Sequence, residues 1–191
     1  MVKFSTGGRH GDVLMNVESG TVTPSKPLSF DPIEEARRQW VEHGWINAAN
    51  GMAVVTSVMR VQQIYMARID SILRPLNLTF ARFELLTLLT FTSTGTLPMN
   101  KIGVRLQVHP TSITSIVDRL EAQGLVQRRS HETDRRTTLV KILSTGRRIQ
   151  KKAVAALNAG VFAKPGISNG ELEQFYSILR TLRAGEQDSA I

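Results

Sequence analysis

The sequence contains no cysteine among its 191 residues. This absence excludes disulfide bonds, thiolate metal sites and any sensing of peroxides through a thiol. The four histidines, His10, His43, His109 and His131, show no metal-ligand spacing, and no second histidine follows His131-Glu132 in the register of a zinc protease. We therefore expect neither a metal nor a cofactor.

Long apolar runs are also missing. No stretch of about 18 apolar residues is present to cross a membrane. The first 16 residues lack the basic-then-apolar layout of a signal peptide. These absences predict a cytoplasmic protein without membrane contact.

The residue patterns of common enzymes are absent as well. The sequence shows no nucleophile-base-acid trio, no glycine-rich loop to hold phosphates and no pair of carboxylates at a catalytic spacing. We therefore expect that the chain is not an enzyme, and an enzyme that merely carries a DNA-binding lobe is the least favoured reading.

Acidic residues are fewer than basic ones, 16 against 24, which gives a formal net charge of +8. Residues 97–150 hold ten Lys or Arg against four Asp or Glu, a net of +6. Most of the excess thus lies in less than a third of the chain, as expected of a surface that binds phosphates. The alternative is that an isolated basic run is only a solvated face.

Residues 109–124 predict a helix with one polar face. Its apolar residues recur three and four positions apart, at Ile113, Ile116, Val117 and Leu120. Small hydroxyl side chains that fit a DNA groove occupy the opposite face, at Thr111, Ser112, Thr114 and Ser115. Pro110 suits the first helical position, and Gly124 suits the left-handed conformation that ends a helix.

A basic β-hairpin is predicted directly after this helix. Residues 125–129 and 137–142 suit two paired strands, with residues 130–136 at the tip. Since strand side chains alternate between faces, Asp134 and Arg136 point the same way and are expected to form an ion pair, while Arg135 points the other way. An arginine held extended at a hairpin tip suits a narrow minor groove.

These residues resemble the MarR-type transcriptional regulators. Asp134-Arg135-Arg136, with Val140, Lys141 and Gly146 after it, resembles the wing signature DRRxxxVxLTxxG of that family. Residues 117–126 resemble its VDRLExxGLV motif, and Leu78-Thr79 resembles the opening of its LTxxxxxxL motif. The resemblance covers residues 51–150.

The sequence departs from the family pattern in three places. His131-Glu132 replaces the usual Asp-Pro ahead of the wing signature, and Leu143 replaces a threonine that ordinarily caps the next helix. We therefore predict that Ser144 caps that helix instead. Gln107 occupies a turn position where glycine is more common, at some cost in backbone strain. None of these departures removes a proposed DNA contact.

The predicted fold is mainly α with a small β-wing. Helices are expected at residues 31–44, 46–73, 79–91, 100–107, 110–123, 146–162 and 168–182. We predict that Asp31 caps the first of them, that the helix at 79–91 is the buried centre of the core, and that Ser168 and Glu171 form a capping box at the start of the last. The predicted organisation is a flexible N-terminal extension at 1–29, a winged helix-turn-helix DNA-binding domain at 76–143, and a helical dimerisation region formed by 30–75 and 144–185.

Apolar stripes on the outer helices exceed what a small winged lobe covers, and we interpret them as a dimerisation bundle. The alternative is that these helices complete a monomeric core. The family resemblance implies a homodimer, which would place two recognition helices roughly 34 Å apart on a pseudo-palindromic operator in double-stranded DNA.

Ten residues are candidate DNA contacts. Thr111, Ser112, Thr114 and Ser115 are assigned to bases and phosphates in the major groove, although hydroxyl residues near a helix start are often only capping groups. The remaining candidates are Pro110 at the helix start, Lys101, Arg119 and Arg128 for phosphates, with Arg129 as a further possibility, and Arg135 and Arg136 for the wing, where Asp134 gives support.

The leading functional interpretation is a transcriptional regulator, a repressor, that a ligand releases from DNA. The resemblance alone supplies the effector, a small aromatic or lipophilic molecule. Trp40, Trp45 and Tyr65 are candidates to line its pocket, with core packing as the alternative. The competing functional class is an architectural DNA-binding protein without an effector.

Overall fold

The computed structural model describes residues 29–131 and 136–185. The chain divides into two compact units, residues 1–54 and residues 55–191, and each is considered by itself. The predicted N-terminal extension lies almost entirely outside the described residues. None of the helices in the described ranges is long and apolar enough to span a bilayer.

The first unit contains α1 (Pro32–Glu42) and the beginning of α2 (Ile46–Leu73). As predicted, Asp31 caps α1, because its Oδ1 accepts hydrogen bonds from the backbone N–H groups of Ile33 at 2.8 Å and Glu34 at 3.4 Å. Trp40 and Trp45 lie edge to face with ring centroids 5.2 Å apart. The predicted bounds of α2 are confirmed, whereas α1 ends at Glu42, two residues before the predicted end at Gly44.

In the second unit, α2 continues to Leu73 and gives way to the short 3-10 turn η1 (Arg74–Leu76), which contains Pro75. Ile69 and Leu73 are buried in the core. The Tyr65 hydroxyl donates a hydrogen bond to the Pro165 carbonyl oxygen at 2.7 Å, and the ring packs against the core. Tyr65 therefore has a packing role.

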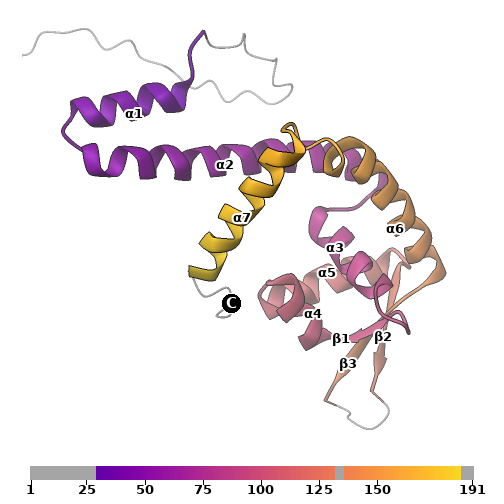
Figure 1. The fold of residues 1–191 in the computed structure, drawn as a ribbon. Helices are drawn as coiled ribbons and strands as arrows, with labels where there is room; N and C mark the ends of the chain where they lie inside the picture. The colour runs from indigo at the N-terminus through magenta and orange to yellow at the C-terminus, as the bar shows by residue number, and fades with distance from the viewer. Residues whose placement is uncertain (1–28, 132–135, 186–191) are drawn as a thin grey trace, which may run out of the picture. The chain divides into compact units, whose positions relative to one another are not determined.

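The winged lobe consists of α3 (Phe80–Thr90), α4 (Met99–Leu106), α5 (Pro110–Ala122) and a three-stranded sheet. The sheet has the order β1-β3-β2, with β1 (Thr96–Pro98), β2 (Val126–Ser130) and β3 (Thr138–Ile142) all antiparallel (Figure 1). The β2-β3 hairpin was predicted, whereas β1 was not. A strand of three residues ending in proline leaves no periodic signal.

The core of this lobe is centred on α3, as predicted. Leu85, Leu86 and Leu89 are fully buried there. The buried face of α5 packs into the same cluster as the inner face of the sheet, through Ile113, Val117, Leu120, Val126, Val140 and Ile142. Helix α5 is thus fixed by its apolar side, and its other side faces outward.

The chain continues through α6 (Ser144–Leu157), a π-helical turn η2 (Asn158–Phe162) and α7 (Asn169–Gly185). The prediction that Ser144 caps α6 is wrong: Leu143 occupies the cap position without a side-chain hydrogen bond, and Ser144 is the first helical residue. The predicted capping box of α7 is confirmed, since Ser168 and Glu171 hydrogen-bond each other reciprocally.

Candidate nucleic-acid interface

Helix α5 presents the polar face that its sequence predicts. Thr111, Ser112, Thr114, Ser115 and Arg119 are all exposed. The helix starts at Pro110 as predicted, and the backbone N–H of Thr111 hydrogen-bonds to Nδ1 of His109 at 3.3 Å. A row of small hydroxyls on an anchored helix can approach base edges without steric hindrance.

Gly124 ends this helix in the predicted left-handed conformation, with φ of +65°. Its backbone N–H bonds to the Glu121 carbonyl at 2.9 Å, and the Leu125 N–H bonds to the Leu120 carbonyl at 2.9 Å. This pair of bonds is a Schellman motif, which satisfies the last carbonyls of the helix and turns the chain directly into β2.

The turn between α4 and α5 contains Gln107 with φ of +53°, in the left-handed region. The departure noted in the sequence therefore has a structural counterpart, because a side chain occupies a conformation that favours glycine. The turn is closed by a backbone hydrogen bond from Val108 to the Gly103 carbonyl at 3.3 Å.

Arg128 on β2 joins the wing to the recognition helix. Its Nη2 lies 2.6 Å from Oδ1 of Asp118, and its Nη1 lies 2.8 Å from Oε2 of Glu121. The backbone N–H of Arg128 also donates to Oε1 of Glu121 at 2.7 Å, and Nη2 donates to the Thr114 carbonyl at 3.3 Å. Four contacts from one residue thus fix the angle between α5 and the hairpin.

The same contacts shift the ionisation of both partners. The backbone and side-chain hydrogen bonds from Arg128 hold the pKa of Glu121 below its usual range. Partial burial opposes the charge of Arg128, yet the hydrogen bonds to Glu121 and Asp118 raise its pKa above the ordinary value. The Arg128 guanidinium, predicted from the sequence to contact a DNA phosphate, is therefore used within the protein.

Sequence reasoning missed this ion-pair cluster. The available signal was the spacing of Asp118 and Glu121, which places both carboxylates on one helical face. Which arginine they bind depends on the tertiary position of β2. The neighbouring Arg129 is exposed and donates to the Gln127 side chain at 3.3 Å.

A hollow of about 530 Å³, here named the Arg82 hollow, lies between the start of α3 and the outer face of α5. Its lining includes Arg82, Arg119 and Ser115. Arg82 is held in place by hydrogen bonds from Nη1 to the Asn77 carbonyl at 3.1 Å and from Nε to Oγ1 of Thr79 at 3.2 Å. The guanidinium of Arg119 forms no hydrogen bond or ion pair within the described residues. Two arginines beside a recognition helix suit a phosphate group, and Arg82 is a candidate that sequence reasoning missed.

The remaining predicted contacts lie on the same lobe or outside the described residues. Lys101 is exposed on α4, and Arg136 is exposed two residues before the start of β3. The hairpin is closed near its tip by a hydrogen bond from the His131 N–H to the Thr137 carbonyl at 3.1 Å. Asp134 and Arg135 lie outside the described residues, so the ion pair expected between Asp134 and Arg136 stays a prediction.

Comparison with known proteins places this arrangement in a family. The sequence model of the MarR family matches residues 78–138, from the start of α3 into β3. The MarR family regulator Sco5413 of Streptomyces coelicolor is 43% identical and superposes with a TM-score of 0.66 over 73% of this chain and 96% of its own. The chain belongs to the MarR family.

Two further proteins are similar to this chain. The organic hydroperoxide resistance transcriptional regulator of Bacillus subtilis (strain 168) is 31% identical over 111 residues, 58% of this chain and 74% of the relative. CouR from Rhodococcus jostii RHA1, solved with bound p-coumaroyl-CoA, is 25% identical, with a TM-score of 0.59 over 68% of this chain and 90% of its own. MarR family members are DNA-binding transcriptional regulators, so this chain is a regulator and not an enzyme.

Membership of the MarR family gives the signature residues a structural meaning in this chain. Asp118 and Glu121 of the VDRLE segment bind Arg128, and Gly124 closes the helix. Gly146, the last residue of the wing signature, lies so close to β2 that an added Cβ would fall 2.2 Å from the Leu125 carbonyl oxygen. These positions serve to align α5, the hairpin and α6.

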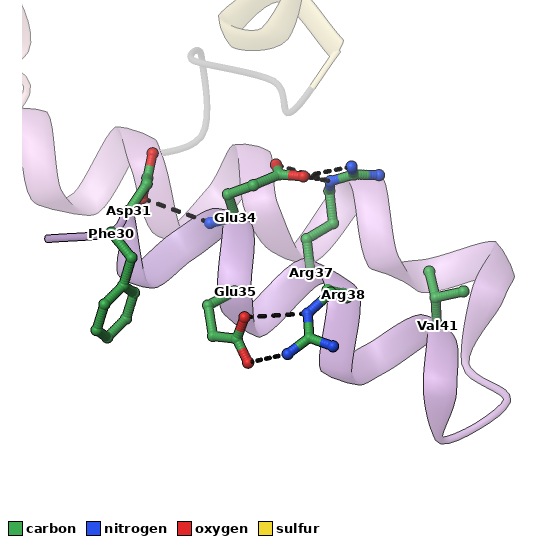
Figure 2. A pocket seen from close by; sticks show the side chains of 7 residues that line it. All are labelled: Phe30, Asp31, Glu34, Glu35, Arg37, Arg38 and Val41. Atoms are coloured by element: carbon green, nitrogen blue, oxygen red, sulfur yellow. Dashed lines mark hydrogen bonds and ion pairs between the residues drawn. The ribbon is translucent and has the colours of Figure 1, made fainter.

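A separate hollow of about 440 Å³ runs along α1, in the first unit. Figure 2 shows that its charged side chains pair with one another, Glu34 with Arg37 and Glu35 with Arg38. The hydrogen bonds from these arginines lower the pKa of both glutamates. Four of its five charged side chains are thus paired with one another, and the fifth, Asp31, caps α1. Across the described ranges, no group of His, Asp or Glu is arranged to hold a metal ion.

Proposed function

We propose that this MarR-family chain is a repressor that binds a pseudo-palindromic operator as a homodimer and is released by a small-molecule ligand. The observation that carries the DNA contact is the outward face of α5, where four hydroxyl side chains and Arg119 are exposed beside the Arg82 hollow. In this arrangement Thr111, Ser112, Thr114 and Ser115 contact bases and phosphates, while Arg119, Arg82 and Lys101 contact phosphates. Acting on chromosomal DNA, the protein would work in the cytoplasm.

Exposed apolar side chains support the homodimer. In the second unit, the α2 residues Val55 and Met59 are 60% and 59% exposed, and the α7 residues Ile178 and Leu182 are 59% and 52% exposed. Exposed apolar residues gathered on helices outside the DNA-reading lobe are typical of a subunit interface. A two-fold dimer would present two copies of α5 to half-sites about one DNA turn apart.

The relatives support a ligand response. CouR was solved with p-coumaroyl-CoA, and the Bacillus subtilis relative is named for organic hydroperoxide resistance. Because this chain has no cysteine, any response to a peroxide would have to proceed without a thiol. A ligand with different affinity for the DNA-bound and free conformations would shift the equilibrium between them.

The test is a titration of labelled duplex from the DNA upstream of the protein's own gene, followed by fluorescence anisotropy at several salt concentrations. A scrambled duplex of the same composition serves as the comparison. The proposal expects tighter binding to the upstream duplex, by a factor of about 10³ or more. Equal affinity for both duplexes would favour an architectural DNA-binding protein.

A changed half-site spacing and a pair of arginine variants make the titration more specific. Insertion of five base pairs between the half-sites should greatly weaken binding, since it rotates one half-site to the opposite side of the helix. Arg119→Ala should weaken binding, whereas Arg180→Ala on the exposed face of α7 should leave it unchanged. Molar mass measured by light scattering reports the dimer independently of DNA.

A further inference from the structure

The second unit contains another hollow, and the proposed DNA contact assigns no role to the residues that line it. Its volume is about 310 Å³, at the small end of the range for ligand sites, and it lies between α3, the end of α4 and η2. Its walls are aromatic: Phe80, Phe83, Phe91 and Phe162 all line it.

Two of the four rings are open to a ligand, and a third, Phe83, is buried beneath them. Phe91 is 80% exposed and Phe162 is 47% exposed. Phe80 and Phe83 stack with their centroids 6.1 Å apart, which gives a continuous apolar surface. The π-helical turn η2 buries Val161 while leaving its neighbour Phe162 at the hollow.

One carboxylate, Glu84, lies among these rings. It is half-buried, and no hydrogen bond or ion pair to it occurs within the described parts of the chain. Burial alone raises its pKa above the ordinary value, because no basic group nearby offsets the loss of hydration. A partly desolvated carboxylate without a partner is costly unless a cation or a hydrogen-bond donor binds it.

We propose that this hollow binds a small organic cation, an amine or quaternary ammonium that carries an apolar group, with its nitrogen against Glu84 and its apolar part against the phenylalanine rings. Aromatic faces attract cations, and a carboxylate adds direct charge pairing. The ligand class would differ from that of CouR, because p-coumaroyl-CoA is an anion, which Glu84 would repel.

The position of the hollow suits the ligand response of the proposed function, on which this consequence rests. Leu106, which lines it, is the last residue of α4 and is followed by the left-handed Gln107 that leads to α5. A molecule bound there contacts the helix-turn-helix at its turn. It would therefore alter the orientation of the recognition helix without occupying the DNA surface.

Calorimetric titration of the full chain with three probes tests the binding: benzyltrimethylammonium, benzyl alcohol and phenylacetate. We expect the cation to bind about tenfold more tightly than the alcohol, and phenylacetate to bind most weakly. This order is diagnostic because the chain has a net charge of +8, which disfavours cations at long range.

Variants locate the site. Glu84→Gln should abolish the advantage of the cation and leave the affinity for benzyl alcohol unchanged, and Phe91→Ala should weaken both. Glu173→Gln on α7 is the matched control and should change neither affinity. The proposal is overturned if the cation binds no more tightly than the alcohol, or if Glu84→Gln keeps the preference. The proposal also fails if the Glu84→Gln variant is more monomeric than the parent chain and still prefers the cation. The carboxylate would then serve the contact between subunits.

These outcomes are separate from the proposed function. Operator binding without any ligand reports the regulator role, and calorimetry without DNA reports the cation site. If one of these experiments fails, the conclusion from the other is unaffected.

Discussion

Gly146 shows how one residue without a side chain controls the packing of an entire helix. An added Cβ would lie 2.2 Å from the Leu125 carbonyl oxygen and 2.9 Å from Cγ1 of Ile142. The Leu125 carbonyl also accepts the Leu143 backbone N–H at 3.0 Å, so it cannot move without breaking a bond at the start of α6.

Gly146→Ala should therefore lower the free energy of unfolding by about 1–3 kcal/mol, the usual cost of forcing extra volume into a packed site. Urea denaturation measures this as a lower midpoint. The control is Gly51→Ala on α2, where no atom lies within 4 Å of the added Cβ and where helix propensity favours alanine. Equal midpoints for the two variants would mean that α6 adjusts freely to the methyl group.

At Gln107, in contrast, a residue with a side chain occupies a backbone conformation that favours glycine. Its φ of +53° lies in the left-handed region, where the Cβ atom causes a steric cost. Gln107→Gly should raise the free energy of unfolding by about 0.5–1 kcal/mol, because relief of strain exceeds the entropy that glycine adds to the unfolded chain.

Thermal unfolding followed by circular dichroism checks the sign of this effect. Gln62→Gly, at an exposed position within α2, should do the reverse and lower the melting temperature, because glycine is unfavourable in a helix. A destabilised Gln107→Gly variant would show that the glutamine side chain contributes a contact that outweighs its strain.

At the scale of elements, Arg128 determines how α5 and the hairpin are oriented. Arg128→Ala should lower the free energy of unfolding by about 1–2 kcal/mol, since it removes charge-assisted hydrogen bonds to Asp118 and Glu121 that are partly exposed. Operator affinity should fall as well, although the guanidinium is not available to contact a phosphate.

The stability that the Glu121–Arg128 ion pair contributes should decrease as the pH falls. Because the folded-state pKa of Glu121 is lowered by Arg128, its contribution to stability is present above the ordinary pKa of glutamate, about 4.3, and is lost as pH falls through the lower folded value. Glu121→Gln should thus lose less stability on acidification than the parent chain. A double-mutant cycle with Arg128→Ala measures the coupling, and additive effects would contradict the ion pair.

The elements also show what the sequence could predict. The long helices, their caps at Asp31 and Ser168 and the stop at Gly124 depend on residues close together in the chain, and their prediction is confirmed. The Arg128 partners and the Arg82 hollow depend on tertiary contacts between separate elements, which periodicity does not encode. The error at Ser144 has a related cause: the start of α6 is fixed by the close approach of Gly146 to β2, so no side-chain cap is required.

At the scale of the whole molecule, the salt dependence of DNA affinity reports how many subunits contact the duplex. Each lost phosphate contact lowers the slope of log affinity against log salt concentration by about 0.9. If Arg119 contacts one phosphate in each protomer of a homodimer, Arg119→Ala should reduce the slope by about two, and Lys101→Ala should do the same.

The measurement is anisotropy on the operator duplex across a salt series, with Arg180→Ala on α7 as a control that should leave the slope unchanged. A reduction of about one for Arg119→Ala would indicate that only one recognition helix engages the duplex. An unchanged slope with weaker binding would assign Arg119 to a base or a structural contact. Since the net charge changes equally in Arg119→Ala and Arg180→Ala, a difference between their slopes reports the location of the charge, and so the surface that meets DNA.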